Sequence, residues 1–271
     1  MKDLHIHTKY SDGEFDENEI LEKIKKAKLS EFAICDHDTI EGSQKVKELL
    51  IENGENIVFH SGVELTSRLN FLNGFNIHLL AYDFDYDNEN IIFLIDKISN
   101  LRLQKVSRMA DLIKEAFNFE IPQKDITETL KTTNSFGKPH MFTILSKYIS
   151  VDRKIFYSTM NNLHSEDLKL DANEVIEKVH NAGGKVVLAH LIEVVKEYDL
   201  NNQQLEEIIA NLKNLGLDGL ETKHSSHTKE NSHLYSSLAK KYGLFETSGS
   251  DYHGPFVKPD IEIGNCEKID N

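Results

Sequence analysis

The chain has 271 residues, enough for one barrel-sized domain with a large core, and its 39% hydrophobic and 28% charged residues are typical of a globular protein. Its net charge of −14 argues against a protein that tracks along duplex DNA, because such proteins usually carry a basic stripe. It has two cysteines, no apolar run of about 18 residues and no secretory leader, so we expect a cytoplasmic protein without membrane contact.

The first part of the chain alternates predicted strands and helices. Apolar segments predict strands at residues 2–7, 31–36, 56–64 and 76–83. Helical patterns follow the first two strands. Asp16 is a typical N-cap residue for the first of these helices.

The middle of the chain has a different pattern from the two ends. Residues 88–170 carry helical signals and almost no strand, which predicts an inserted helical cap. After residue 172 the alternation returns, with predicted strands at KVVLAH, LDGLETK and LFETSGSD. We therefore expect βα units around a parallel sheet, closed or nearly closed as a barrel, over residues 1–87 and 171–271.

Residues that can bind metal ions stand near the ends of these predicted strands. His5 and His7 form a His-x-His pair, and side chains two residues apart in a strand point to the same side. The other candidates are Asp12, His37, Glu64, His78, His190, Asp251 and His253. Imidazoles mixed with carboxylates suit Zn²⁺, Mn²⁺ or Fe²⁺. Nine candidates are too many for one ion, and multi-metal sites commonly hydrolyse phosphate esters.

Six segments closely resemble the PHP family, named for polymerase and histidinol phosphatase domains: HIHTKYSDG, ICDHDTIEG, GVELT, IHLLAY, VVLAH and SGSDYHG. The chain looks most similar to bacterial members that act on 3′,5′-nucleoside bisphosphates and on the 5′ ends of short RNA. Those members also carry a helical insertion before an A-x-GG-x-x-VLAH segment. The resemblance implies an α/β fold, a distorted (β/α)7 TIM-like barrel, with two to three divalent Mn, Fe or Zn ions in a trinuclear site.

The resemblance also implies which residues bind which ion. The first ion would be bound by His5, His7, Glu64 and Asp251, the second by Glu64 with His78 and His190, and the third by Asp12, His37 and His253. One position departs from the family pattern. Leu191 stands where the family often has proline, and this change concerns only the local shape of the loop.

Further residues are candidates for supporting the metals or contacting the substrate. Asp36 and Asp38 flank His37, and we expect them to orient imidazole ligands. Candidate substrate contacts are Arg102, Arg108, Lys138, His140, His224 and His227. Arginine suits phosphate because its planar guanidinium donates to two phosphate oxygens at once.

These residues predict a metal-dependent phosphoesterase in which a metal-held water loses a proton and attacks phosphorus. We expect a small phosphorylated nucleotide or a short RNA 5′ end as substrate, and no obligatory protein partner. Histidinol-phosphate phosphatase is the first alternative. Arg102, Arg108 and Lys138 favour a nucleotide, because a bisphosphate needs a second phosphate site. A non-catalytic accessory domain is the second alternative, and the filled set of nine ligand positions argues against it.

Overall fold

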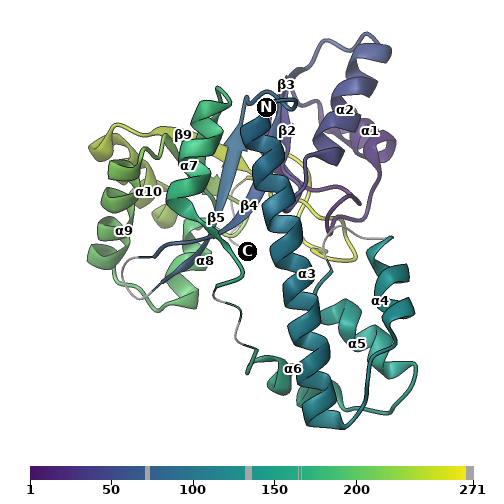
Figure 1. Cartoon of the computed structure of the whole chain (residues 1–271). Coiled ribbons are helices and arrows are strands. Elements are labelled where there is room, and N and C mark those ends of the chain that lie inside the picture. The colour runs from purple at the N-terminus through teal and green to yellow at the C-terminus, as the bar shows by residue number, and fades with distance from the viewer. Residues whose placement is uncertain (71–73, 132–135, 164, 166, 267–271) are drawn as a thin grey trace. The chain divides into compact units, whose positions relative to one another are not determined.

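The computed structural model describes residues 1–70, 74–131, 136–163, 165 and 167–266, and it shows a mixed α/β fold (Figure 1). The chain divides into two compact units. The larger unit comprises Met1–Ile95 and Leu170–Asn271, and the smaller unit comprises Asp96–Lys169. None of the helices in the described ranges combines the length and the apolar character that crossing a membrane requires.

The larger unit contains a three-stranded and a six-stranded sheet. The first sheet has the order β1-β2-β3 and consists of β1 (Lys2–Ile6), β2 (Glu31–Ile34) and β3 (Val58–His60). The second has the order β6-β4-β5-β7-β8-β9 and consists of β4 (Gly62–Arg68), β5 (Asn76–Tyr82), β6 (Leu170–Asp171), β7 (Lys185–Leu188), β8 (Gly219–His224) and β9 (Phe245–Gly249). Single bridges join Ile6 to Tyr252 and His37 to Glu64, so the two sheets touch at two places.

Two predictions about the strands were wrong. The predicted strand 56–64 is two strands, because the chain leaves the first sheet after β3 and enters the second as β4. The predicted parallel arrangement fails at β5, which runs antiparallel to both β4 and β7. The connection between β4 and β5 is too short for a parallel crossover, which needs about a dozen or more residues. The reversal places His78, at the start of β5, beside the end of β7.

Helices pack on the strands of the larger unit through apolar faces. They are α1 (Glu17–Ala27), α2 (Glu41–Glu52), α7 (Ala172–Asn181), α8 (Leu191–Glu197), α9 (Asn202–Leu215) and α10 (Lys229–Tyr242). The predicted N-cap of α1 is confirmed, since the Asp16 side chain accepts hydrogen bonds from the amides of Asn18 and Glu19. Ile20 and Ile24 of α1 are buried in the core that includes β1 and β2.

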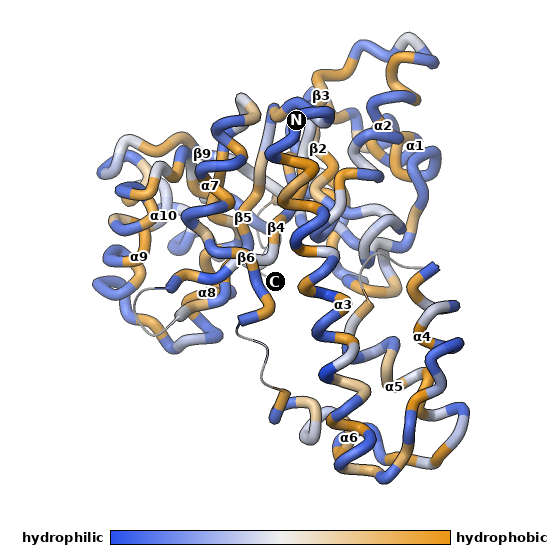
Figure 2. The backbone as a smooth tube through the Cα atoms, viewed as in Figure 1, coloured by the Kyte–Doolittle hydropathy of each residue, from blue (hydrophilic) through white to orange (hydrophobic). Residues whose placement is uncertain are grey.

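The smaller unit is helical and has its own core. It contains most of α3 (Glu89–Phe117), together with α4 (Gln123–Leu130), α5 (Lys138–Ser146) and α6 (Arg153–Met160). Apolar and polar residues alternate along α3 (Figure 2). Val106, Met109 and Ile113 of α3 are buried with Met141 and Phe156 in this core. The unit lies within residues 88–170, where the sequence predicts an insertion. Its role as a cap stays a prediction.

Candidate metal centre

All nine predicted metal ligands belong to the larger unit and come from segments that meet at the ends of its strands. His5 and Glu64 lie within β1 and β4, and His78 lies near the start of β5. The others follow strands, with His7 and Asp12 after β1, His37 after β2, His190 after β7, and Asp251 and His253 after β9. Residues more than 240 positions apart in the chain thereby reach one site, since His7 Nε2 lies 3.2 Å from Asp251 Oδ1.

The Glu64 carboxylate lies at the centre of this site and is fully buried. Each of its oxygens faces imidazole rings. Oε1 lies 2.8 Å from His78 Nδ1 and 2.8 Å from His190 Nε2. Oε2 lies 3.0 Å from His37 Nδ1 and 3.2 Å from the Nε2 atoms of His5 and His7. A carboxylate that shares its two oxygens among five imidazoles has the position of a ligand that bridges cations.

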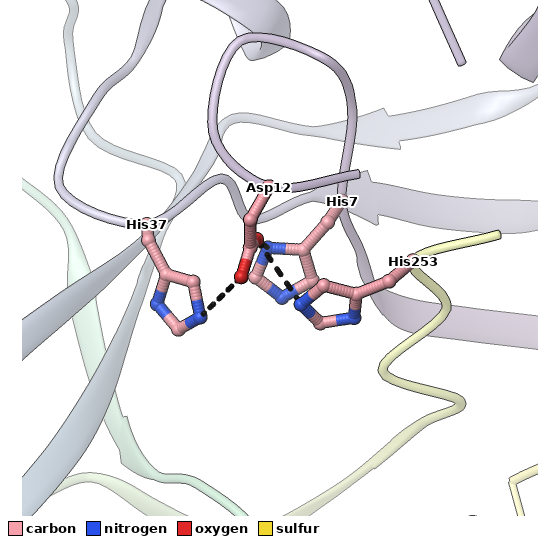
Figure 3. A group of neighbouring side chains, drawn as sticks. All are labelled: His7, Asp12, His37 and His253. Carbon is pink, nitrogen blue, oxygen red and sulfur yellow. Dashed lines mark ion pairs between the residues drawn. The ribbon is translucent and has the colours of Figure 1, made fainter. Parts of the chain in front are cut away.

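A second carboxylate, Asp12, faces the imidazole rings of His7, His37 and His253 (Figure 3). Its Oδ1 lies 3.1 Å from His253 Nε2, and its Oδ2 lies 3.8 Å from His37 Nε2. The rings of His7 and His253 stack beside it with centroids 4.0 Å apart. One potential ligand atom from each of these four residues lies within 4.8 Å of the others, which is close enough for one cation to contact them all.

Several buried atoms of the site have no hydrogen-bond partner, which tests whether the residues fit a metal. These atoms are His5 Nε2, His7 Nε2, His37 Nδ1 and Glu64 Oε2. An unsatisfied buried polar group costs about 1–3 kcal/mol, so such groups are rare without a function. All four atoms are ligand types that a divalent transition metal accepts. The residues therefore fit Zn²⁺, Mn²⁺ or Fe²⁺.

The electrostatics of the site favour cations. Burial would raise the pKa of Glu64 and of Asp251, but the surrounding histidines hold both pKa values well below the usual range. Burial lowers the pKa of His7 to about 4, so its ring is neutral and keeps a lone pair for a metal. Burial also lowers the pKa of His37, but the negative charge of Glu64 has the larger effect and raises this pKa to about 9. A cation at His37 must therefore displace a proton.

Glu221 is a buried carboxylate of the site that the sequence analysis missed. Its Oε1 lies 3.0 Å from His5 Nδ1, and its Oε2 accepts a hydrogen bond of 2.7 Å from the His190 backbone amide. A proton held on His5 Nδ1 leaves Nε2 with the lone pair that points toward Glu64. The sequence offered only a glutamate inside the predicted strand LDGLETK, and its burial beside His5 shows its role.

We expect Glu221→Gln to lower metal affinity about 10- to 100-fold, the usual effect of losing a hydrogen-bond partner of a metal-binding histidine. Glutamine keeps the shape but loses the negative charge that fixes the His5 tautomer. The exposed Glu177 of α7 provides the matched control, Glu177→Gln. Competition with a fluorescent metal chelator measures the affinity. Equal affinity in both variants would show that Glu221 does not support the site.

Asp36 and Asp38 contact hydroxyl and amide groups near the predicted ligands. Asp36 accepts hydrogen bonds from Ser11 Oγ at 2.6 Å and from the Thr8 amide at 2.7 Å. Burial raises the pKa of Asp36 to about 6, against the effect of these hydrogen bonds. Ser11 Oγ lies 3.4 Å from His7 Nδ1, so Asp36 acts on an imidazole through the loop after β1. Asp38 holds the amide and hydroxyl of Thr66.

The predicted substrate contacts fall into two groups. Arg102, Arg108, Lys138 and His140 belong to the helical unit. There Arg108 makes two 2.7 Å hydrogen bonds to Asp167, and His140 Nδ1 accepts from the Gly137 amide.

His224 and His227 lie in the larger unit and are buried. His224 Nε2 lies 3.3 Å from Asp251 Oδ2, so this histidine joins the edge of the metal centre. His227 is 0% exposed, and its ring nitrogens bond to the Thr222 carbonyl and the Ile192 amide. Because both nitrogens are used within the fold, we do not retain His227 as a substrate contact.

Three site residues have strained backbones. Asp38, His190 and Asp251 have φ values of 59°, 26° and 57°, in the left-handed region that non-glycine residues rarely adopt. Such strain costs on the order of 1–3 kcal/mol per residue and collects at functional sites. The fold thus maintains this arrangement of ligands against a local cost.

An α/β fold with a buried cluster of histidines and carboxylates at its strand ends is typical of metal-dependent hydrolases. Comparison with known families is consistent with this class. Residues 3–107 match the family model described as PHP domain. Residues 3–107 are therefore similar to the PHP domain, the family that the sequence motifs resemble.

Three curated relatives match nearly the whole chain. A 5′-3′ exoribonuclease of Haemophilus influenzae is 26% identical, over 99% of this chain and 95% of the relative. A phosphoribosyl 1,2-cyclic phosphate 1,2-diphosphodiesterase of Eggerthella lenta is 27% identical, over 94% and 95%. A 3′,5′-nucleoside bisphosphate phosphatase of Chromobacterium violaceum is 24% identical, over 98% and 92%. These relatives are all enzymes named for acting on phosphate esters or RNA.

A crystal structure from Bifidobacterium adolescentis, assigned to the metal-dependent phosphoesterases, has a similar fold. It is 27% identical, covers 99% of this chain and 92% of its own, and gives a TM-score of 0.76. The similarity extends over both units of the chain, so the larger unit and the helical unit occur together in that protein as well.

Proposed function

We propose that the protein is a metal-dependent phosphoesterase that hydrolyses phosphate esters of small nucleotides, either 3′,5′-nucleoside bisphosphates or the 5′ ends of short RNA. The observation that carries this proposal is the arrangement of five imidazoles around the buried Glu64 carboxylate, where three imidazole nitrogens and Glu64 Oε2 lack hydrogen-bond partners. The names of the relatives from Haemophilus influenzae and Chromobacterium violaceum support this choice of substrate.

Two or three divalent Mn, Fe or Zn ions would be held by the nine ligands. The groups that lie close enough to share an ion support this number, and they are His7 with Asp12, His37 and His253; His5 with His7 and Glu64; His37 with Glu64 and His78; and His5 with His224 and Asp251. When bound, such ions polarise phosphoryl oxygens and lower the pKa of a water molecule to near neutrality.

The chain's own residues prepare the site for this chemistry. Glu64 would hold neighbouring cations together against their mutual repulsion. Glu221 keeps the proton on Nδ1 of His5 and presents Nε2 to the site. Asp36 fixes the loop that carries Asp12 through its bonds to Thr8 and Ser11.

We also infer that the strands of the larger unit form a distorted (β/α)7 TIM-like barrel. The bridge from Ile6 to Tyr252 connects β1 to the segment after β9, and the bridge from His37 to Glu64 connects the segment after β2 to β4. These bridges support a ring in the order β1-β2-β4-β5-β7-β8-β9, which would have the seven strands that the family resemblance implies.

A direct test measures hydrolysis of four compounds by the manganese-loaded protein, followed as released phosphate or, for the RNA, as released nucleoside 5′-monophosphate. They are a 3′,5′-nucleoside bisphosphate, a 5′-phosphorylated short RNA, a ribose 1,2-cyclic phosphate treated with a phosphatase after the reaction, and histidinol phosphate. We expect the first two to be hydrolysed with the highest kcat/KM. The cyclic phosphate represents a second candidate function, favoured by the relative from Eggerthella lenta. Preference for histidinol phosphate would contradict the proposal.

If Arg108 binds the second phosphate of a bisphosphate, Arg108→Ala should lower kcat/KM for that substrate about 10- to 100-fold or more, since a charge-assisted contact contributes roughly 1.5–3 kcal/mol. Hydrolysis of a simple aryl phosphate should barely change. The exposed Arg153 of α6 gives a control on the same unit, Arg153→Ala. Equal losses on both substrates would instead place Arg108 at the reacting phosphate.

A further inference from the structure

Lys258 is a cationic residue in contact with the carboxylates of the metal centre. Its ammonium donates a hydrogen bond to Asp251 Oδ2. The Lys258 side chain is 33% exposed, whereas that of Asp251 is 5% exposed. The ammonium therefore lies where the buried cluster of ligands meets solvent.

The backbone around Lys258 is held by residues next to predicted ligands. The Lys258 amide donates to the Gly254 carbonyl at 2.8 Å, which closes a turn directly after His253. Glu14 ties this turn to the loop that carries Asp12, because it bonds the Phe256 amide through its carboxylate and the His253 carbonyl through its amide. A Cβ atom on Gly254 would lie 2.6 Å from Glu14 Cβ, so this close approach needs glycine.

The two oxygens of Asp251 face different groups. Oδ1 faces the metal-binding cluster, with His7 Nε2 at 3.2 Å and His253 Nδ1 at 3.3 Å. Oδ2 faces Lys258 and His224. A cation held through Oδ1 would thus have the Lys258 ammonium on the other oxygen of the same carboxylate. An anion that binds such a cation comes close to the ammonium.

A divalent cation on Asp251 also changes what Lys258 can bind. It neutralises the carboxylate and repels the ammonium, so the attraction that holds Lys258 to Asp251 weakens. An ammonium has three N–H donors on a flexible four-carbon stem, and phosphate is an anion that it commonly binds. The same ammonium can therefore turn to a phosphate oxygen while its backbone stays fixed.

We propose that Lys258 binds the phosphate group of the substrate at the metal centre and is a specificity-determining residue for phosphate esters. This role rests on the proposed function, because a phosphoesterase must bring a phosphate dianion to this site. It differs from the role considered for Arg108, which concerns the phosphate that does not react.

The test measures binding of inorganic phosphate to manganese-loaded protein by calorimetry, together with metal content by elemental analysis. We expect Lys258→Gln to raise the phosphate dissociation constant about 10- to 100-fold, as for loss of one charge-assisted hydrogen bond, with metal content unchanged. Lys258→Arg should stay near the wild type. Lys240→Gln, at an exposed lysine of α10, controls for the same loss of charge.

Three outcomes would overturn the proposal. Loss of metal in Lys258→Gln with unchanged phosphate affinity per loaded site would show that Lys258 only positions Asp251. An equal rise of the phosphate dissociation constant in Lys240→Gln would show that the net charge of the protein, and not a contact of Lys258, sets phosphate affinity. If the wild type does not bind phosphate, no phosphate site exists. If Lys258→Gln does not fold, Lys258→Met, which keeps an unbranched stem, takes its place. Phosphate binding through Lys258 without ester hydrolysis would refute the proposed function alone.

Discussion

Glu64→Gln should remove at least one bound ion per chain and lower turnover at least roughly a hundredfold. Loss of an outer hydrogen-bond partner of a ligand already costs about 10- to 100-fold, and Glu64 faces the metal-binding atoms directly. Glutamine has nearly the same shape, but its neutral amide cannot offset the repulsion between two cations.

Elemental analysis and the rate of phosphate release measure the two effects of Glu64→Gln. The exposed Glu177 of α7 again gives the control, because Glu177→Gln makes the same chemical change at an exposed helix position that is not a predicted ligand. Activity within a fewfold of the wild type, with full metal content, would show that Glu64 does not bridge ions.

Removing divalent cations with a chelator should lower the free energy of unfolding by about 2.7 kcal/mol or more, relative to protein with free metal at 100 times its dissociation constant. Metal should stabilise the folded state because its buried imidazole nitrogens and Glu64 Oε2 lack hydrogen-bond partners. A metal ion can satisfy these atoms together only when the chain is folded. Urea unfolding with and without manganese gives the difference.

The Glu64→Gln variant serves as the internal control for this effect. It should show a smaller stabilisation by manganese than the wild type, because it binds fewer ions. Identical unfolding curves of the wild type with metal and with chelator would contradict a structural fit between the cluster and a divalent cation.

The sequence was sufficient to predict which residues meet, because ligand-type residues near strand ends converge when the strands share a sheet. His5, His37 and Asp251 illustrate this, since each lies at or just after a strand and reaches the group around Glu64. The resemblance to a known family further predicted which of these residues would bind the same metal ion. The direction of β5 was not predictable in this way. A histidine near the start of an apolar strand, such as His78, has the same sequence pattern as a histidine near its end.

Contacts that depend on tertiary packing were harder to foresee. Glu221 lies within a strand, where a carboxylate usually faces solvent, and only its burial beside His5 shows its role. Lys258 stands in a turn rich in proline and glycine, and nothing in its neighbours predicts contact with Asp251. His227 stood in a segment rich in polar residues, yet packing against Tyr235 buries it completely.

The most direct test of the central claim is a titration of metal-free protein with manganese, in which bound equivalents and phosphate release from a 3′,5′-nucleoside bisphosphate are measured in the same samples. We expect two to three equivalents to bind and activity to appear only as the second equivalent is bound, because two of the possible ligand groups share Glu64 and would hold neighbouring ions. Full activity in protein without bound metal would contradict a metal-dependent phosphoesterase. So would a protein that binds no manganese even at a saturating concentration.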